Sequence, residues 1–377
     1  MVERELTVSG DIRDQKIIIL GLSGIGDALM FSPALELLRK RYPAARIDFL
    51  SMFKGVEELF LGNRDLTGVL YRDFLHANPF SSFFYLLNLR RRRYDVSINV
   101  YPSNRWHYNI ISAIIGARKR LGHDYNHANT RSLNFLNNLR VHEDDRRHNV
   151  EENVRLIGLL EGEPGAPDGS VRALPGLNVV LGEQDKQFAH SWLKEHGIPV
   201  QSLIVGFHAG SSSMKNHERR RWAPEKFAQL GASLVDQSGA TVLLFGGPDE
   251  YGLNRSINQM MAGKGICVEA PSLMKSVALM SHCSVFVSND SGLMHVAAGL
   301  QIPTVAIFAY TNPAYVHPWQ TPSIVVRRDL ECSPCFFYSP RSAHCKWTED
   351  RFRCITHIEA DEIFQAVGKL VKETTNR

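Results

Sequence analysis

An apolar run leads into a tight turn in the segment Val285-Phe286-Val287-Ser288-Asn289-Asp290-Ser291-Gly292, and a small, apolar helical pattern follows over Leu293–Leu300. This order predicts a buried strand, a turn and a helix N-terminus. The free backbone N–H groups of Ser291, Gly292 and Leu293, together with the positive end of the helix dipole, would form an anion site suited to a diphosphate. The alternative is a capped helix start, with Asp290 or Ser291 as the N-cap.

A second glycine-rich turn lies near the N-terminus, where the apolar run Lys16–Leu20 leads into Gly24-Ile25-Gly26-Asp27 and a long helical stretch that ends near Arg41. A phosphate-binding loop of nucleoside triphosphatases is excluded, because Asp27 stands where its lysine is needed. A dinucleotide fingerprint fits little better, since Leu29 occupies the position of its third glycine. The carboxylate of Asp27 is therefore expected at the C-terminal end of a strand, either as a functional group or as an N-cap.

The composition is typical of a soluble globular protein, with 44 % hydrophobic and 22 % charged residues, and a length of 377 residues suggests two domains. No apolar stretch follows a basic N-terminus, and no window approaches the ~18 apolar residues of a membrane span. These features predict a cytoplasmic location. The net charge is only +4, but Arg90–Thr130 contains eight basic residues and two acids. This local excess favours an anionic partner, although no nucleic acid is expected.

Short apolar runs alternate with helical patterns along most of the chain, which predicts an α/β fold with parallel sheets. The predicted strands are Lys16–Leu20, Arg46–Leu50, Val96–Val100, Leu203–Phe207, Thr241–Phe245, Ser284–Val287 and Thr304–Phe308. Glycine, proline and aspartate interrupt this pattern between Glu161 and Gly176, which indicates a linker. We therefore expect one domain over residues 1–175 and another over residues 176–377, with a ligand between them.

Four blocks in this order resemble glycosyltransferase family 9, the ADP-heptose:lipopolysaccharide heptosyltransferases. They are Gly24–Leu29 with Pro33-Ala34-Leu35, His208-Ala209-Gly210 with Arg220–Phe227, Gly246–Glu250, and Asn289–His295 with Pro303–Ala306. The resemblance implies a GT-B architecture, with two doubly wound Rossmann-like domains facing across a cleft. The acceptor would lie on the N-terminal domain and the nucleotide-sugar on the C-terminal domain. A final helix, Glu359–Lys372, would pack back.

The resemblance also implies roles for individual residues in an inverting transfer of heptose from ADP-heptose. Asp27 matches the general base, and Arg220, in place of the usual lysine, would stabilise the leaving diphosphate without a metal. Arg221 is the alternative cation, and the segment Ser211–Arg219 is longer and more polar than usual. The residues expected at the substrates are Gly24, Gly26, Arg221, Glu250 at the ribose, Asp290, Ser291, Gly292, Leu293 and His295. A histidine in an apolar helix is often only packed in the core, so His295 and His208 rank below Asp27 and Arg220. Glu250 has the alternative of a solvated loop carboxylate.

The basic stretch suits an acceptor with carboxylates and phosphates, as in the inner core of lipopolysaccharide. The segment Phe80–Leu89 is rich in aromatic residues and is followed by Arg90–Arg93. It is consistent with a helix on the anionic inner face of the cytoplasmic membrane. It is equally typical of a core helix with a solvated end.

Four of the six cysteines cluster late, at Cys332, Cys335, Cys345 and Cys354. Such a set can hold a structural Zn or Fe ion, while reduced thiols are the alternative in a cytoplasmic chain. Heptosyltransferases that modify autotransporter proteins are similar in having a cysteine-bound iron, so a protein acceptor is a second hypothesis. A catalytically inactive sugar-nucleotide-binding protein is a third. An NAD-dependent oxidoreductase is disfavoured, because no acid ends the second strand at Ser51.

Overall fold

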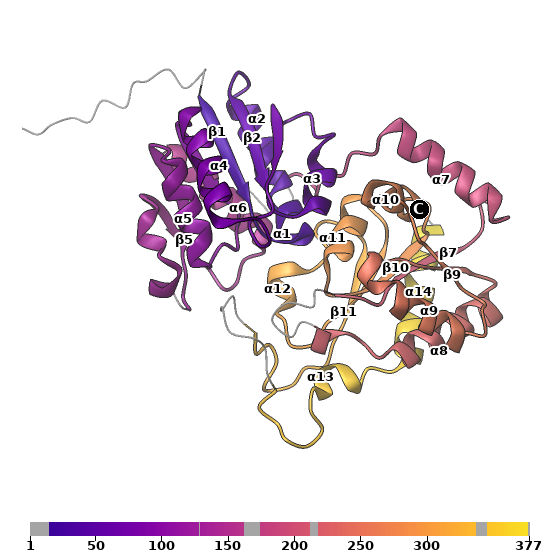
Figure 1. Ribbon diagram of the computed structural model, residues 1–377. Helices are drawn as coiled ribbons and strands as arrows, with labels where there is room; N and C mark the ends of the chain where they lie inside the picture. Colours follow the sequence, from indigo (N-terminus) through magenta and orange to yellow (C-terminus); the bar gives the residue numbers. More distant parts are fainter. Residues whose placement is uncertain (1–14, 128, 162–173, 212–217, 337–344, 376–377) are drawn as a thin grey trace, which may run out of the picture.

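The computed structural model describes residues 15–127, 129–161, 174–211, 218–336 and 345–375. These residues form two halves, each a six-stranded parallel sheet flanked by helices (Figure 1). The α/β, GT-B architecture predicted from the sequence is confirmed. Residues 162–173 of the predicted linker and the N-terminal residues 1–14 lie outside the described residues, and the division at 175/176 stays a prediction.

The N-terminal sheet has the strand order β3-β2-β1-β4-β5-β6, and β1 pairs in parallel with both β2 and β4. Its strands are β1 (Lys16–Gly21), β2 (Arg46–Ser51), β3 (Gly68–Tyr71), β4 (Val96–Asn99), β5 (Lys119–Asp124) and β6 (Leu139–His142). The central strands are buried along almost their whole length, as expected where helices cover both faces of a parallel sheet. The chain order reverses between β1 and β4.

The C-terminal sheet repeats this topology, with the order β12-β11-β10-β7-β8-β9. Its strands are β7 (Ile204–His208), β8 (Thr241–Leu244), β9 (Ile266–Cys267), β10 (Val285–Asn289), β11 (Thr304–Ile307) and β12 (Ser323–Val326). Here the chain order reverses between β7 and β10. In doubly wound sheets, ligands bind beyond the carboxyl ends of the strands at such a reversal.

Fourteen α-helices connect the strands within the described residues. They are α1 (Ile25–Leu29), α2 (Ser32–Arg41), α3 (Lys54–Phe60), α4 (Pro79–Arg91), α5 (Trp106–Ile115), α6 (Asn149–Gly158), α7 (Glu183–Glu195), α8 (Pro224–Ser238), α9 (Tyr251–Met260), α10 (Leu273–Met280), α11 (Gly292–Gly299), α12 (Pro313–Val316), α13 (Arg353–Thr356) and α14 (Ala360–Thr375). Short 3₁₀ helices cover Thr130–Ser132, Asn134–Leu136, Leu159–Glu161 and Pro248–Glu250. No helix in this described part is long and apolar enough to cross a bilayer.

The single long helix expected before Arg41 is broken into α1 and α2, which corrects the sequence-based prediction. Pro33, in the first turn of α2, has no N–H group and cannot continue the hydrogen-bond ladder to the carbonyl of Leu29. The hydroxyl of Ser32 donates to that carbonyl at 2.7 Å instead. The break leaves α1 as a short helix whose N-terminus lies beside β1.

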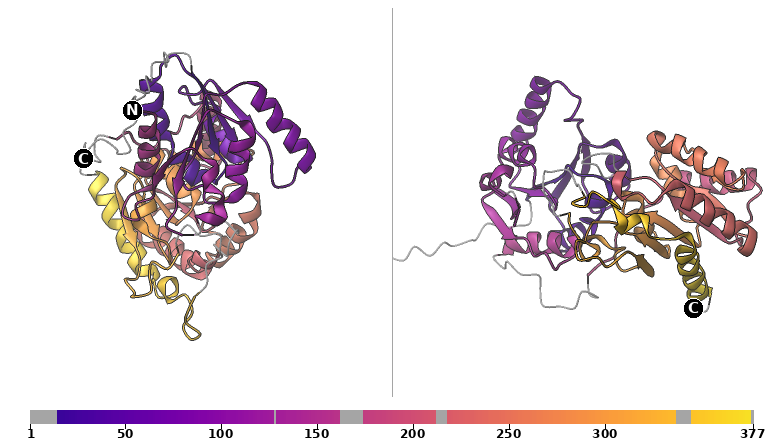
Figure 2. Two further views of the ribbon diagram at one scale, coloured as in Figure 1. Left: turned by 90° about the vertical axis from the view of Figure 1, so that its left-hand side faces the viewer. Right: turned by 90° about the horizontal axis from the view of Figure 1, so that it is seen from below.

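The two halves contact each other at several points. α1 packs against α11, and the Glu58 carboxylate accepts a hydrogen bond from the Leu273 N–H at 3.0 Å. His148 Nε2 donates to the carbonyl of His317 at 3.0 Å, since its Nδ1 accepts from the Val150 N–H. The last helix, α14, packs back onto α8 and strands β10–β12, and the yellow helix lies on that half in Figure 2.

Candidate active site

A cavity of about 340 Å³ lies where the carboxyl ends of the two sheets meet. Its walls come from the segments that follow β1, β4, β7 and β10, which are the strands at the two chain reversals, and from the region around α12. The predicted site residues among its lining are Gly24, Gly26, Asp27, Arg220, Asp290, Ser291, Gly292 and His295. The fold thus brings most of the predicted site into one cavity.

Asp27 lies in the first turn of α1 and is half-buried in the wall of the cavity. The N-cap of this helix is Gly24, so the alternative reading of Asp27 as the N-cap is wrong. Tyr108 and Arg105 line the same wall. Burial raises the pKa of Tyr108 to about 12, and the negative charge of Asp27 adds to this effect while Arg105 opposes it. Tyr108 is therefore a neutral phenol at physiological pH.

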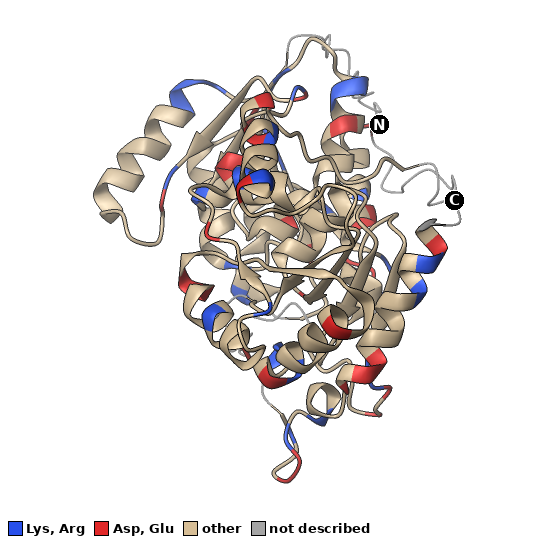
Figure 3. Cartoon of the chain, turned by 90° about the vertical axis from the view of Figure 1, so that its right-hand side faces the viewer, with Lys and Arg blue, Asp and Glu red and all other residues tan. Residues whose placement is uncertain are grey.

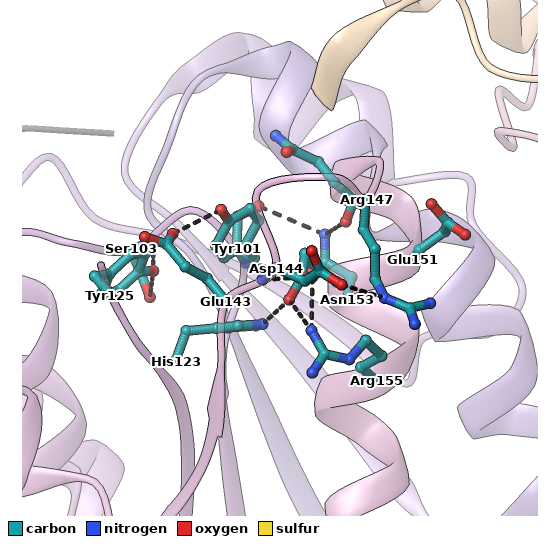
Figure 4. Close-up of polar contacts among 12 residues, drawn as sticks. Tyr101, Ser103, His123, Tyr125, Glu143, Asp144, Arg147, Glu151, Asn153 and Arg155 are labelled. Atoms are coloured by element: carbon teal, nitrogen blue, oxygen red, sulfur yellow. Dashed lines mark hydrogen bonds and ion pairs between the residues drawn. The ribbon is translucent and has the colours of Figure 1, made fainter. Parts of the chain in front are cut away.

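Residues after β4 complete the N-terminal wall, and a buried polar network behind them fixes their backbone (Figure 4). The hydroxyl of Tyr101 donates to Glu143 at 2.9 Å, and the Asn153 side chain accepts from the Tyr101 N–H at 2.9 Å. The hydroxyl of Tyr125 accepts from the Ser103 N–H. These contacts hold the segment 101–105, which carries Pro102, Asn104 and Arg105 into the cavity. The sequence reasoning did not identify Asn104 or Tyr108 as site residues.

Ser291 is the N-cap of α11, but its side chain makes no capping hydrogen bond. Its Oγ lies 2.8 Å from His208 Nδ1 and 3.0 Å from Ser288 Oγ. The alternative of a merely capped helix start therefore fails for Ser291. The first N–H groups of α11 face a cavity rather than a cap, which is the arrangement that binds anions. The side chain of Leu293 packs in the core, so only its backbone is available to a ligand.

Arg220 lies opposite this helix start and forms a buried ion pair with Asp290, with Nη1 2.8 Å from Oδ2. Arg220 Nε is buried without a partner among the described residues. Arg221 points elsewhere, because its guanidinium donates to the hydroxyl and the carbonyl of Ser211 and does not line the cavity. The geometry therefore separates the two cation candidates in favour of Arg220. Residues 212–217 of the long polar segment before it lie outside the described residues.

Glu250 ends a 3₁₀ helix after β8 and is not a solvated loop carboxylate. Its Oε2 accepts from His208 Nε2 at 3.0 Å and from the Gly247 N–H at 3.1 Å. Burial favours the neutral acid, but the contact with His208, the Gly247 N–H and the nearby Arg221 outweigh it and lower the pKa of Glu250. Glu250 does not line the cavity itself, so its predicted contact with the ribose stays a prediction.

His295 is both buried in α11 and part of the cavity wall. Burial lowers its pKa to about 4, so the ring is neutral at physiological pH. Its edge lies against Gly26, where an added Cβ would come within 2.6 Å of Cδ2. Gly292 is equally close to α1, since a Cβ there would lie 3.3 Å from the Cβ of Ile25. Glycine at both positions lets the two helices touch.

Five buried polar atoms in the wall have no hydrogen-bond partner among the described residues. They are Ser23 Oγ, Asn104 Nδ2, Arg220 Nε, His295 Nδ1 and Thr311 Oγ1. Buried polar groups are nearly always paired in folded proteins, and leaving one unpaired costs about 1–3 kcal/mol. These atoms belong to residues that line the cavity, so a ligand with many hydroxyl and phosphate oxygens is a candidate partner for them. The residues that carry these atoms follow β1, β4, β7, β10 and β11, so only folding brings them together.

Comparison with known proteins agrees with this geometry. The model of glycosyltransferase family 9 (heptosyltransferase) matches residues 86–345. The chain belongs to this family. It is 26 % identical over 317 residues to lipooligosaccharide heptosyltransferase 2 of Haemophilus influenzae, which covers 82 % of this chain and 88 % of the relative. It is 25 % identical over 330 residues to lipopolysaccharide heptosyltransferase 2 of Escherichia coli K12, covering 83 % and 88 %.

Solved structures of family 9 enzymes share the fold. The glycosyl transferase family 9 protein of Veillonella parvula superimposes with a TM-score of 0.73 at 20 % identity, covering 96 % of this chain and 99 % of the other. The ADP-heptose lps heptosyltransferase II of E. coli gives a TM-score of 0.71 at 20 % identity, covering 96 % and 100 %. The protein is thus a glycosyltransferase with the GT-B fold, as the sequence predicted.

The four late cysteines of this family 9 member are neighbours in space. Burial raises the pKa of Cys354 to about 11, and the charges of Cys335, Cys345 and Cys332 add to the effect. All four are free thiols. However, no group of three or more His, Cys, Asp or Glu side chains is placed to hold a metal ion within the residues that the structure describes. The predicted structural Zn or Fe therefore stays a prediction. An iron-containing dodecameric glycosyltransferase, TibC of E. coli, shares the fold with a TM-score of 0.56 at 14 % identity, covering 96 % of this chain and 77 % of the other.

Proposed function

We propose that this enzyme transfers a heptose from ADP-heptose to an acidic inner-core acceptor of lipopolysaccharide, with inversion and without a catalytic metal. The observation that carries the proposal is one cavity lined by Asp27, by the Arg220–Asp290 pair and by the N-terminus of α11. Five polar atoms of its lining residues have no partner among the described residues. A carboxylate on one wall and diphosphate-binding groups on the other are the parts that glycosyl transfer needs.

In this mechanism the diphosphate of the donor lies against the first turn of α11 and Arg220. Asp27 accepts the proton of the acceptor hydroxyl as the hydroxyl oxygen bonds to the sugar C1. The bond from C1 to the diphosphate oxygen breaks on the opposite face, and its electron pair leaves with ADP. Arg220 Nε and the N–H groups of Gly292 and Leu293 stabilise the charge that develops there through charge-assisted hydrogen bonds and the helix dipole.

The inner-core acceptor is favoured by the relatives, which are named lipopolysaccharide or lipooligosaccharide heptosyltransferases, and by Arg105 in the N-terminal wall. A guanidinium there suits an acceptor with carboxylates or phosphates. The decisive experiment incubates the protein with ADP-heptose and either truncated lipopolysaccharide or an autotransporter adhesin fragment, and detects the product by mass spectrometry. Heptose on the lipid alone supports the proposal, and heptose on the protein alone supports the alternative acceptor. If the protein binds the donor but shows neither transfer nor hydrolysis that depends on Asp27, it is an inactive binding protein.

We further propose that the enzyme works in the cytoplasm and contacts the inner membrane through α4. Phe80, Phe83 and Phe84 are 76 %, 46 % and 63 % exposed, whereas Ser82, Leu86 and Leu89 face the domain. The three phenylalanines therefore lie on the exposed face of α4, while Leu86 and Leu89 pack in the core as the alternative of a core helix expected. In Figure 3 this helix stands at the edge of the N-terminal half, uncharged along its length and basic at its end, where Arg90–Arg93 are exposed. Aromatic rings and arginines on one exposed helix suit an anionic interface.

A vesicle sedimentation assay tests this contact. The wild type should bind vesicles with phosphatidylglycerol more strongly than vesicles of phosphatidylcholine alone, and Phe80→Ser/Phe84→Ser should lose most of this binding. Leu61→Ser, which removes an exposed apolar side chain from another element, is the matched control. Equal binding by the double variant and the wild type would refute the contact.

A further inference from the structure

A buried chain of hydrogen bonds runs from Glu250 through His208 to Ser291. Glu250 Oε2 lies 3.0 Å from His208 Nε2, and His208 Nδ1 lies 2.8 Å from Ser291 Oγ. The side chains of Glu250 and His208 are 17 % and 5 % exposed, and Ser291 lines the cavity. The three residues come from η7 (Pro248–Glu250), the end of β7 and the start of α11. They therefore connect a carboxylate outside the cavity to a hydroxyl at the expected diphosphate position.

The partners of this chain fix where its hydrogens lie. Glu250 accepts from the Gly247 N–H and is ionised, so His208 Nε2 carries a proton and donates it. If His208 is neutral, its Nδ1 is a lone pair and the hydroxyl of Ser291 must donate to it. The hydroxyl of Ser288 is engaged with the Asn289 carbonyl at 2.7 Å, so neither serine then has a hydrogen for their 3.0 Å contact. If His208 is an imidazolium, Nδ1–H donates to Ser291 and the Ser291 hydrogen is released.

The charges around these hydrogen bonds favour the imidazolium form of His208 when an anion binds. Arg220 is neutralised by Asp290, and Arg221, which lies near Glu250, donates to Ser211. His295, in α11, is neutral. With neutral His208, the chain places the negative charge of Glu250 behind the anion site. A proton on His208 cancels that charge and frees the Ser291 hydrogen, which points to Ser288 in the absence of a ligand and to the anion when one binds.

We propose that Glu250, His208 and Ser291 form a proton-linked clamp, in which His208 takes up a proton when the diphosphate of a nucleotide-sugar binds at Ser291. His208 is a positioning residue, because it acts on the ligand through Ser291. Glu250 holds the proton on Nε2, so that the additional proton goes to Nδ1. The inference rests on the proposed function for the identity of the ligand. It adds that binding of this ligand is coupled to the uptake of one proton.

The test is isothermal titration calorimetry with ADP-glucose in three buffers that differ in their ionisation enthalpy. The diphosphate of ADP-glucose has no group that titrates near neutral pH, so a buffer-dependent heat reports protons bound by the protein. At pH 7.5 the wild type should take up between about 0.3 and 1 proton per chain, and its affinity should decrease as the pH rises to about 8.5. His208→Gln should take up less than about 0.1 proton and show an affinity that is independent of pH.

Two further variants keep the result interpretable. Ser291→Ala leaves the Glu250–His208 pair intact and should reduce the proton uptake, so the clamp is tested even if His208→Gln folds poorly. His282→Gln, a half-buried histidine outside the cavity, should behave as the wild type. Uptake that persists in His208→Gln and disappears in His295→Asn would place the proton on His295 and overturn the clamp. Binding without proton uptake overturns the clamp alone, whereas no binding of either ADP-glucose or ADP-heptose at millimolar concentration overturns the proposed function with it.

Discussion

The ion pair between Arg220 and Asp290 makes a quantitative prediction about donor binding. Arg220 lines the cavity, and its Nε is buried without a partner among the described residues. Arg220→Ala removes this guanidinium. A hydrogen bond to a charged group contributes about 1.5–3 kcal/mol, which corresponds to a loss of ADP affinity of about 10- to 150-fold. The loss should lie at the upper end of this range, because the variant also leaves the Asp290 carboxylate, with a side chain only 6 % exposed, beside the anion.

A double variant separates these two contributions. Arg220→Ala/Asp290→Asn removes the unpaired carboxylate together with the arginine, so it should bind ADP at least about fivefold more tightly than Arg220→Ala. Arg221→Ala is the matched control, since its guanidinium is held by Ser211 outside the cavity, and its affinity should stay within about twofold of the wild type. ADP titration calorimetry at fixed ionic strength measures all four proteins. An Arg220→Ala affinity within twofold of the wild type, or a larger loss in Arg221→Ala, would refute the assignment.

Three further predictions follow from other parts of the structure. Asp27→Asn should bind ADP like the wild type but lower transfer at least ~100-fold, with little change in melting temperature because Gly24 is the N-cap; turnover within tenfold of the wild type would remove Asp27 as the base. The folded pKa of His295 is about 4 against 6.5 unfolded, so the unfolded chain binds the extra proton and stability falls as the pH decreases through this interval. Urea unfolding should show that the free energy of unfolding falls less with decreasing pH in His295→Asn than in the wild type, with a difference of up to ~3 kcal/mol at pH 4. The same dependence on pH in both proteins would contradict this prediction. If the late cysteines bind metal, elemental analysis should find about one Zn or Fe per chain, and Cys335→Ser should release it. A metal content below about a tenth of an equivalent per chain would support the alternative of reduced thiols.

The buried central strands could be predicted from the sequence, whereas the four edge strands and β5 could not. The seven predicted strands match the structure to within one or two residues, because central strands covered on both faces consist of nearly continuous apolar runs. The missed strands β3, β5, β6, β9 and β12 are short or polar. β5, with the sequence Lys-Arg-Leu-Gly-His-Asp, has no apolar run from which a strand could be predicted. Its buried His123 is instead paired with Glu152, a contact that only the folded chain assembles.

The site shows the same division between local and long-range information. Glycine-rich turns after apolar strands identified Asp27 and the start of α11, because strand, turn and helix signals are local in sequence. The ion pair from Arg220 to Asp290 joins residues 70 positions apart, and no spacing rule predicts it. Nor could the sequence decide between Arg220 and Arg221, adjacent residues whose guanidinium groups bind different partners, Asp290 and Ser211.

The contact between α1 and α11 has a consequence for motion of the two halves. Gly26 and Gly292 lie so close that no side chain separates the helix that carries Asp27 from the helix that begins at Ser291. In the proposed mechanism, substrate entry and ADP release would move the two halves relative to each other, and such a movement changes distances least near its pivot. A pivot at the contact of Gly26 with Gly292 would let the rims of the cleft move far while the distance between Asp27 and Ser291 changed little. An alanine at either position would push α1 and α11 apart. The distance between Asp27 and the start of α11 would then increase, although neither substituted residue takes part in the reaction.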